Sequence, residues 1–186
     1  MAAVAGAVLA AGAGTRMGTP KADLIVAGRR LLDRAVTALR EGGCTPVIAV
    51  VREGTTVGGV RAVVNPDPSR GMRSSLALAV EAAALADVAA LAVLLVDVPG
   101  IGPEAVRATV EAWRPGRVAI ATFDGRRGHP IVMAPEFWTE ALAVAGADEG
   151  ARSWLRAHPG LVDEIDVAGD PCDLDTPEDV RRWAGG

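Results

Sequence analysis

The sequence VLAAGAGTRMGTPKADL, residues 8–24, decides how the rest of this chain is interpreted. A short apolar run stops at a glycine, and the next few residues hold two cations, Arg16 and Lys21, and three glycines, Gly12, Gly14 and Gly18. Backbone N–H groups can close around an anion in such a loop, because glycine has no side chain to keep the anion away. Two cations inside the loop favour phosphate as that anion. The alternative is a plain strand-to-loop turn in a glycine-rich protein.

The loop differs from the two commonest phosphate loops. Its spacing, G-x-G-x-x-x-G, is one residue longer than the dinucleotide fingerprint. The order G-x-x-x-x-G-K-[ST] is also absent, because Lys21 follows Pro20 and precedes Ala22. The loop instead resembles the opening signature L-A-A-G-x-[SG]-x-R-M-G-x-x-K of nucleotidyltransferases, and among these the molybdopterin nucleotidyltransferase, or MobA-like NTP transferase, family. This resemblance implies a nucleotide held by Leu9, Ala10, Ala11, Gly12, Gly14, Arg16, Gly18 and Lys21.

Length and composition predict one domain, residues 1–186, with a substantial core. The formal charge of −4 gives no support to nucleic-acid binding, which usually needs a basic excess. No apolar segment approaches the ~20 residues that span a bilayer, and the apolar N-terminal stretch lacks the positive region of an export signal. Cys44 and Cys172 lack the spacing of a zinc site or a disulfide framework. We therefore expect reduced thiols and a cytoplasmic protein that binds no membrane.

Strand and helix patterns alternate along the chain. The patterns predict helices that begin near residues 31, 72, 103, 135 and 177, and strands at 46–51, 60–64, 89–96, 117–123, 128–134 and 161–167. Such alternation predicts an α/β fold with a mostly parallel sheet. The turn signal Asp124-Gly125 joins two strands as a hairpin, so the sheet should be mixed. The family resemblance implies a three-layer, Rossmann-like nucleotidyltransferase fold.

A proline-rich loop from Asn65 to Gly71 leads into a helix that starts at Met72-Arg-Ser-Ser-Leu. Ser74 or Ser75 can cap that helix, and a capped helix alone would explain the pattern. The family has a similar stretch, an asparagine followed by a loop that ends G-M-x-x-S-L near the nucleotide. The resemblance therefore implies that Asn65, Gly71, Ser74 and Ser75 belong to the nucleotide site.

Asp97 directly follows an apolar run that is typical of a central parallel strand. The carboxyl ends of such strands are where ligands bind in open α/β sheets. A turn aspartate is the alternative, but a phosphate loop needs a divalent cation nearby, which favours a metal ligand. The D-x-P unit is similar to the family's magnesium-binding aspartate. The family's D-[IL]-[DN]-T-P motif implies a second ligand, either Asp173 or Asp175, and the sequence does not rank them.

Two further residues resemble acceptor-side motifs of the family. His129 stands in G-H-P at the entry to a strand, where a lone histidine would ordinarily be a turn residue. Arg152 ends the stretch D-E-G-A-R, which resembles the family's G-D-x-G-A-R. The resemblance implies that both contact the acceptor and that Arg152 holds its phosphate, while a solvated helix arginine is the alternative.

The sequence shows no nucleophilic cysteine, Ser-His-Asp set or zinc ligands, so its chemistry fits phosphoryl or nucleotidyl transfer catalysed by Arg16, Lys21 and Asp97. The resemblance implies that a nucleoside monophosphate moves from an NTP to the phosphate of a molybdopterin-type cofactor, with Mg²⁺ bound and pyrophosphate released. Ala11 and Thr19-Pro20-Lys21 favour CTP, because guanosine users of the family tend to carry a second glycine and G-x-D-K there. A molybdoenzyme is the expected partner. Three alternatives remain: transfer to another phosphorylated acceptor, a molybdenum cofactor-binding chaperone for a hydroxylase, and redox work on a nicotinamide or flavin.

Overall fold

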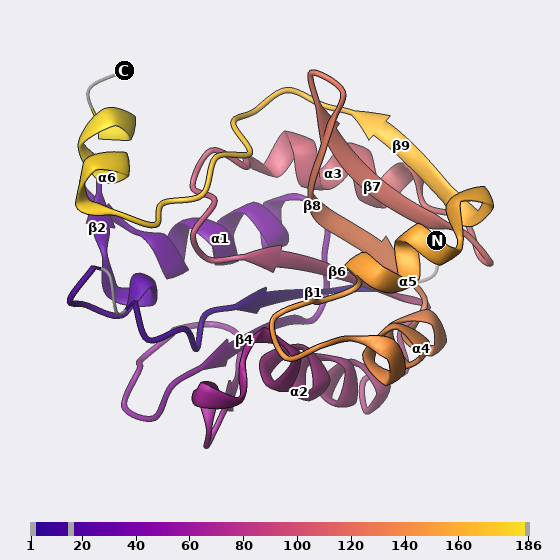
Figure 1. The fold of residues 1–186 in the computed structure, drawn as a ribbon, viewed down its shortest axis with the longest axis horizontal. Helices are drawn as coiled ribbons and strands as arrows, with labels where there is room; N and C mark the ends of the chain where they lie inside the picture. Colours follow the sequence, from indigo (N-terminus) through magenta and orange to yellow (C-terminus); the bar gives the residue numbers. More distant parts are fainter. Residues whose placement is uncertain (1–2, 15–16, 185–186) are drawn as a thin grey trace.

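A seven-stranded sheet runs through the middle of the molecule in the order β5-β4-β1-β6-β8-β7-β9 (Figure 1). The computed structural model describes residues 3–14 and 17–184. The strands are β1 (Val4–Leu9), β4 (Val47–Val51), β5 (Arg61–Val64), β6 (Ala90–Leu95), β7 (Val118–Phe123), β8 (Arg126–Met133) and β9 (Val162–Asp166). Within this sheet β8 pairs antiparallel with both β6 and β7, and the remaining pairs are parallel. The predicted mixed α/β sheet and its hairpin are thus confirmed.

Helices cover both faces of the sheet and make three layers (Figure 1). On one face, α1 (Leu31–Glu41) packs against α3 (Pro103–Ala112); on the other, α2 (Met72–Ala84) packs against α4 (Pro135–Val144), and α4 against α5 (Arg152–Ala157). The chain ends in α6 (Pro177–Ala184). Short elements fill the connections: the 3-10 turns η1 (Lys21–Asp23), η2 (Pro68–Arg70) and η3 (Pro159–Leu161), and a hairpin of β2 (Ile25–Val26) and β3 (Arg29–Arg30). No described helix is long and apolar enough to cross a membrane.

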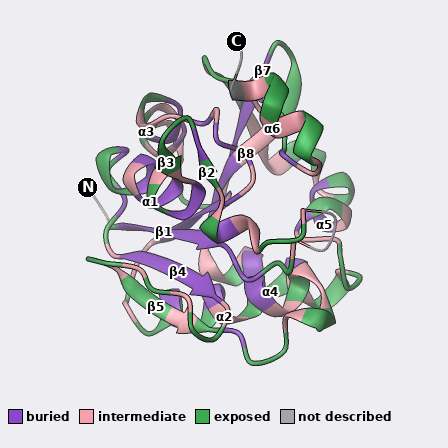
Figure 2. Cartoon of the chain, turned by 90° about the vertical axis from the view of Figure 1, so that its left-hand side faces the viewer, coloured by how far each residue is buried: buried purple, intermediate pink, exposed green. Residues whose placement is uncertain are grey.

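Small and branched aliphatic side chains build the core. All six residues of β1 are buried, and alternate ones join different clusters: Val8 packs on the α1 and α3 side, Ala7 and Leu9 on the α2 and α4 side. Figure 2 shows the central strands buried between helices whose outer faces are exposed. Because both faces of the sheet are covered, the sequences of the central strands are continuous apolar runs.

The parallel strands β1, β4 and β6 end at one edge of the sheet. Leu9 lies opposite both Leu95 of β6 and Val50 of β4, so the loops after these strands leave side by side. Strand order reverses at β1, since β4 lies on one side of it and β6 on the other. An open α/β sheet binds its ligands at such a point.

Candidate functional site

The glycine loop leaves the carboxyl end of β1 and folds back on itself. Gly14 has φ +60°, and a Cβ there would lie 2.1 Å from the carbonyl oxygen of Thr19, so the turn requires glycine. The N–H of Met17 donates to the carbonyl of Gly14 at 2.8 Å and closes the turn. At Gly12 a Cβ would meet nothing within 4 Å, so the space beside this residue is open to a ligand. Arg16, a predicted catalytic residue, lies outside the described residues.

Lys21 stands at the end of the loop and joins three segments that are far apart in the sequence. Its ammonium donates to Asp97 Oδ2 at 2.8 Å and to Asp175 Oδ1 at 2.5 Å. Burial lowers the pKa of Lys21, but the hydrogen bonds to Asp175 and Asp97 outweigh it, and the pKa lies above its ordinary value. Lys21 therefore stays charged at neutral pH, held between two carboxylates.

The two carboxylates form a set that fits a divalent cation. Oδ1 of Asp97 is buried and has no hydrogen-bond partner among the described residues, which is costly for a carboxylate oxygen. Hard cations such as Mg²⁺ take oxygen ligands and often use only one or two carboxylates beside substrate phosphates. That mode suits this site, because the part of the chain that the structure describes holds no group of three or more His, Cys, Asp or Glu side chains placed for a metal.

The two candidates for the second metal ligand lie in different surroundings. The N–H of Leu174 donates to the carbonyl of Asp97 at 2.9 Å, which anchors the C-terminal segment at the end of β6. Asp175 then reaches Lys21, whereas Asp173 is exposed. A reciprocal cap follows at the start of α6: Asp179 N donates to Thr176 Oγ1, and Thr176 N donates to Asp179 Oδ2.

The capping role predicted for Ser74 or Ser75 is wrong. The residue before the first turn of α2 is Gly71, with φ +83°, and no side chain caps the helix. The turn η2 ends at this glycine and leads directly into Met72, so both serines lie inside the first helical turn. Their hydroxyls instead accept hydrogen bonds from Asn65 Nδ2, both at 2.9 Å.

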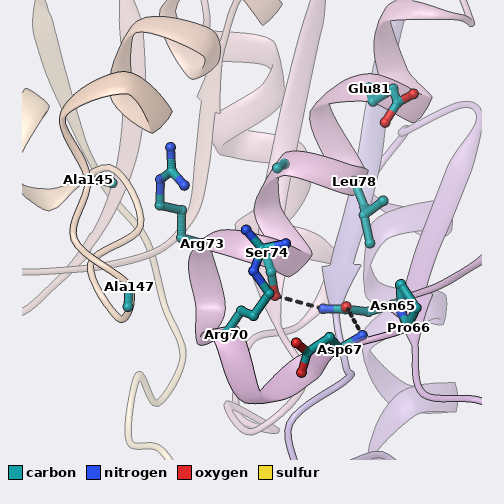
Figure 3. A pocket seen from close by; sticks show the side chains of 11 residues that line it. Asn65, Pro66, Asp67, Arg70, Arg73, Ser74, Leu78, Glu81, Ala145 and Ala147 are labelled. Atoms are coloured by element: carbon teal, nitrogen blue, oxygen red, sulfur yellow. Dashed lines mark hydrogen bonds between the residues drawn. The ribbon is translucent and has the colours of Figure 1, made fainter.

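Residues from both predicted motifs line one cavity of about 310 Å³ at the carboxyl edge of the sheet. Its walls are Leu9, Ala11, Gly12, Lys21, Pro68, Gly71, Met72, Ser75, Leu95, Val96, Asp97 and Asp148. Ser74 does not line it. That serine faces a second cavity of about 400 Å³, on the side of α2 where Asn65, Asp67, Arg70 and Arg73 gather (Figure 3).

Asp148 lines the cavity, although the sequence does not predict it as a site residue. A Cβ on Gly71 would lie 2.4 Å from the carbonyl of Ala147 and 2.5 Å from Asp148 Oδ1, so the 147–148 loop presses against the start of α2. Arg73 N–H donates to the same Ala147 carbonyl at 3.0 Å. Asp148 is the first residue of the D-E-G-A-R stretch, whose last residue, Arg152, is the one predicted to bind the acceptor.

The two predicted acceptor residues lie apart. His129, within the interior strand β8, is partly buried, and its Nδ1 lies 3.1 Å from the carbonyl of Val93, so Nδ1 carries the proton. Burial lowers the pKa of His129, although the Val93 carbonyl and the charge of Asp97 oppose this, and the ring is neutral at pH 7. Arg152 is exposed at the first residue of α5 and does not line the cavity.

The chain is similar in sequence and in fold to known proteins. The profile of the family described as MobA-like NTP transferase domain matches residues 6–162. A protein named nicotine blue oxidoreductase from Paenarthrobacter nicotinovorans is 38% identical over 196 residues, which cover 96% of this chain and 95% of that protein. A probable molybdenum cofactor guanylyltransferase from Opitutus terrae is 38% identical over 163 residues, 86% of this chain and 80% of that one. A crystal structure of Rv0371c from Mycobacterium tuberculosis H37Rv in complex with manganese shares the fold, with TM-score 0.80, 24% identity and 99% of each chain covered.

Proposed function

The chain belongs to the MobA-like NTP transferase family, and from that premise we propose that it moves CMP from CTP to the phosphate of a molybdopterin-type cofactor and releases pyrophosphate. Nucleotidyl transfer itself is the activity of this family. The acceptor, the preference for CTP and the dependence on Mg²⁺ are the parts that we add. One observation carries the proposal: Lys21 and Asp97 line the same cavity as the glycine loop, and the ammonium of Lys21 bridges Asp97 to Asp175.

These residues divide the work of transfer between them. The open backbone beside Gly12 and the cations Arg16 and Lys21 receive the triphosphate, whose charge they neutralise. A phosphate monoester acceptor is largely dianionic at neutral pH, since its second pKa is about 6, and so needs no general base. Its oxygen bonds to the α-phosphorus as the bond to pyrophosphate breaks, and Lys21 follows the charge that builds on the leaving group. Mg²⁺ held by Asp97 and Asp175 would supply further neutralisation of phosphate charge.

Pyrophosphate release tests the reaction. We expect release when the protein receives CTP, Mg²⁺ and a molybdopterin-type acceptor, and tighter binding of CTP than of GTP in titrations with Mg²⁺. The relative named guanylyltransferase makes GTP the competing base. Equal affinities or a GTP preference would remove the cytidine claim and leave transfer standing. Release with another phosphorylated acceptor, and not with the pterin, would remove only the acceptor.

Three alanine variants test the metal site, and Asp173 and Asp175 form a matched pair among them. Asp97→Ala should fold normally and lose turnover, because the transition state loses stabilisation of several kcal/mol. Asp175→Ala should weaken Mn²⁺ binding, while Asp173→Ala should not, because Asp173 is exposed and Asp175 contacts Lys21. Near-normal kcat in Asp97→Ala would contradict the assignment of Asp97.

A second candidate, redox work in the same cleft, is favoured by one finding: the relative named nicotine blue oxidoreductase covers 96% of this chain. NADH oxidation with flavin and a dye acceptor, in the absence of pyrophosphate release, would establish it. The glycine spacing, one residue longer than the dinucleotide fingerprint, argues against it. The chaperone alternative has less support, since Lys21 and Asp97 are both present and in contact. We also propose that the protein delivers its product to a molybdoenzyme partner. Its proposed location is the cytoplasm, where NTPs are available.

A further inference from the structure

Asn65 has a fixed amide orientation. The residue follows β5 and is only 3% exposed. Its Oδ1 accepts the backbone N–H of Asp67 at 3.0 Å (Figure 3). A backbone N–H can only donate, so the oxygen of the amide must point to Asp67 and the nitrogen to α2.

The amide nitrogen in turn fixes the two serine hydroxyls. Nδ2 donates one proton to Ser74 Oγ and the other to Ser75 Oγ, each at 2.9 Å. Ser74 uses its own proton on the carbonyl of Gly71, at 2.8 Å. For the proton of Ser75, residues 3–14 and 17–184 provide no hydrogen-bond acceptor. Since Ser75 lines the 310 Å³ cavity, that proton is left for whatever the cavity holds.

We propose that Asn65 is a positioning residue that turns the Ser75 hydroxyl proton into the nucleotide cavity, so that this wall donates a hydrogen bond and selects a base with acceptors on its pairing edge. This inference rests on the proposed function. The loop and helix that carry Ser75 otherwise offer apolar or backbone surface, from Pro68, Gly71 and Met72, on which a base can pack. Phosphates belong at the charged wall of Lys21 and Asp97.

The direction of this hydrogen bond discriminates between the competing bases. Cytosine presents two adjacent acceptors, N3 and O2, on its pairing edge, whereas guanine presents the donors N1–H and N2–H beside its single acceptor O6. A hydrogen-bond donor in the cavity wall suits cytosine, and fewer groups on the pairing edge of guanine can bond to it. A site with a fixed polar group rejects a ligand that leaves the group unpaired more strongly than apolar packing can.

Three variants test the chain of hydrogen bonds, with CTP and GTP titrated against each in the presence of Mg²⁺. Ser75→Ala removes the donor and should weaken CTP binding about 3–10-fold, with GTP changed less. In Asn65→Asp the carboxylate can only accept, so the Ser75 proton turns toward it and away from the cavity. CTP binding should then weaken to a similar degree, and the CTP-to-GTP affinity ratio should fall. Ser74→Ala is the matched control: it removes a neighbouring hydroxyl but leaves Ser75 bonded to Asn65, so the ratio should stay that of the wild type.

The affinity ratio separates a positioning role from a structural one, because a general loss of stability would lower both affinities together. Circular dichroism and thermal melting of each variant check folding. If Asn65→Asp does not fold, the comparison of Ser75→Ala with Ser74→Ala still tests the inference. An unchanged ratio in Ser75→Ala, an equal shift in Ser74→Ala, or a wild-type preference for GTP would overturn the inference alone. A wild-type protein that binds neither nucleotide would instead overturn the proposed function, and this inference with it.

Discussion

Replacing Lys21 with methionine should lower the free energy of unfolding of the metal-free protein by about 2 kcal/mol. The change leaves the side-chain volume similar and removes the ammonium from between two carboxylates. The contact with Asp175 contributes little, because that side chain is 43% exposed and water screens it. The contact with Asp97 contributes most, since the side chains of Lys21 and Asp97 are only 15% and 21% exposed and the loss strands a sheltered carboxylate. For a domain of this size, about 2 kcal/mol corresponds to a fall in Tm of about 4–8 °C.

Thermal melts with a chelator and with excess MgCl₂ give the test. Bound Mg²⁺ replaces the missing positive charge, so it should raise the Tm of Lys21→Met more than the Tm of the wild type, where the ammonium competes for the same oxygens. Arg127→Met is the control. It breaks an ion pair with Glu164 of 2.7 Å whose side chains are 42% and 48% exposed, and its effect should be small and independent of metal. Equal melting of Lys21→Met and wild type in chelator, or equal stabilisation of both by Mg²⁺, would refute the reasoning.

Three further predictions concern residues of the site and of the core. Gly71→Ala should cost at least about 2 kcal/mol in denaturant unfolding and should weaken nucleotide binding, because φ is +83° and the new Cβ would lie 2.4 Å from the Ala147 carbonyl; no loss would contradict the close approach. Burial raises the pKa of Cys44 to about 12, so the native state keeps a proton that the unfolded state loses above pH ~9. Stability should fall as pH rises through this window, by up to about 4 kcal/mol, and urea unfolding of Cys44→Ala should show a flatter profile. Burial lowers the pKa of His129 against the opposing Val93 carbonyl and Asp97 charge, so the unfolded state binds more protons below pH ~6.5. Stability should therefore fall as pH drops below that value, and His129→Gln should lose this part of the slope in the same assay.

Local pattern was enough to predict most of the fold. The strand predicted at 89–96 is β6, Ala90–Leu95, and the helix predicted to begin near residue 135 is α4, Pro135–Val144. Such elements follow from apolar runs, prolines in first turns and glycines past helix ends, all of which act within a few residues. The two-residue strands β2 and β3 carry no such pattern, and they were not predicted.

The features of the site that the sequence did not predict depend on contacts between residues far apart in the chain, which no local pattern encodes. Lys21 meets Asp97 across 76 residues and Asp175 across 154. The contact of Asp175 with Lys21 accompanies the backbone bond from Leu174 to Asp97, which only the folded chain provides. Ser commonly caps helices, and so the sequence predicts a cap at Ser74 or Ser75; the φ of Gly71 and the amide of Asn65 give these serines another role.

The choice of lysine at position 21 supports a role in which its ammonium moves from the two carboxylates to the phosphate of the nucleotide. The chain has 19 basic residues apart from histidine, and Lys21 is the single lysine among them. Arginine would bind one carboxylate through its planar fork and hold that geometry. An ammonium on a flexible stem can instead bridge Asp97 and Asp175 in the free protein and turn to phosphate oxygens when a nucleotide enters. Lys21→Arg should therefore keep most of the stability that Lys21→Met loses, and still lower kcat. If Lys21→Arg turned over at the wild-type rate, charge alone would be enough at this position and the exchange of partners would be wrong.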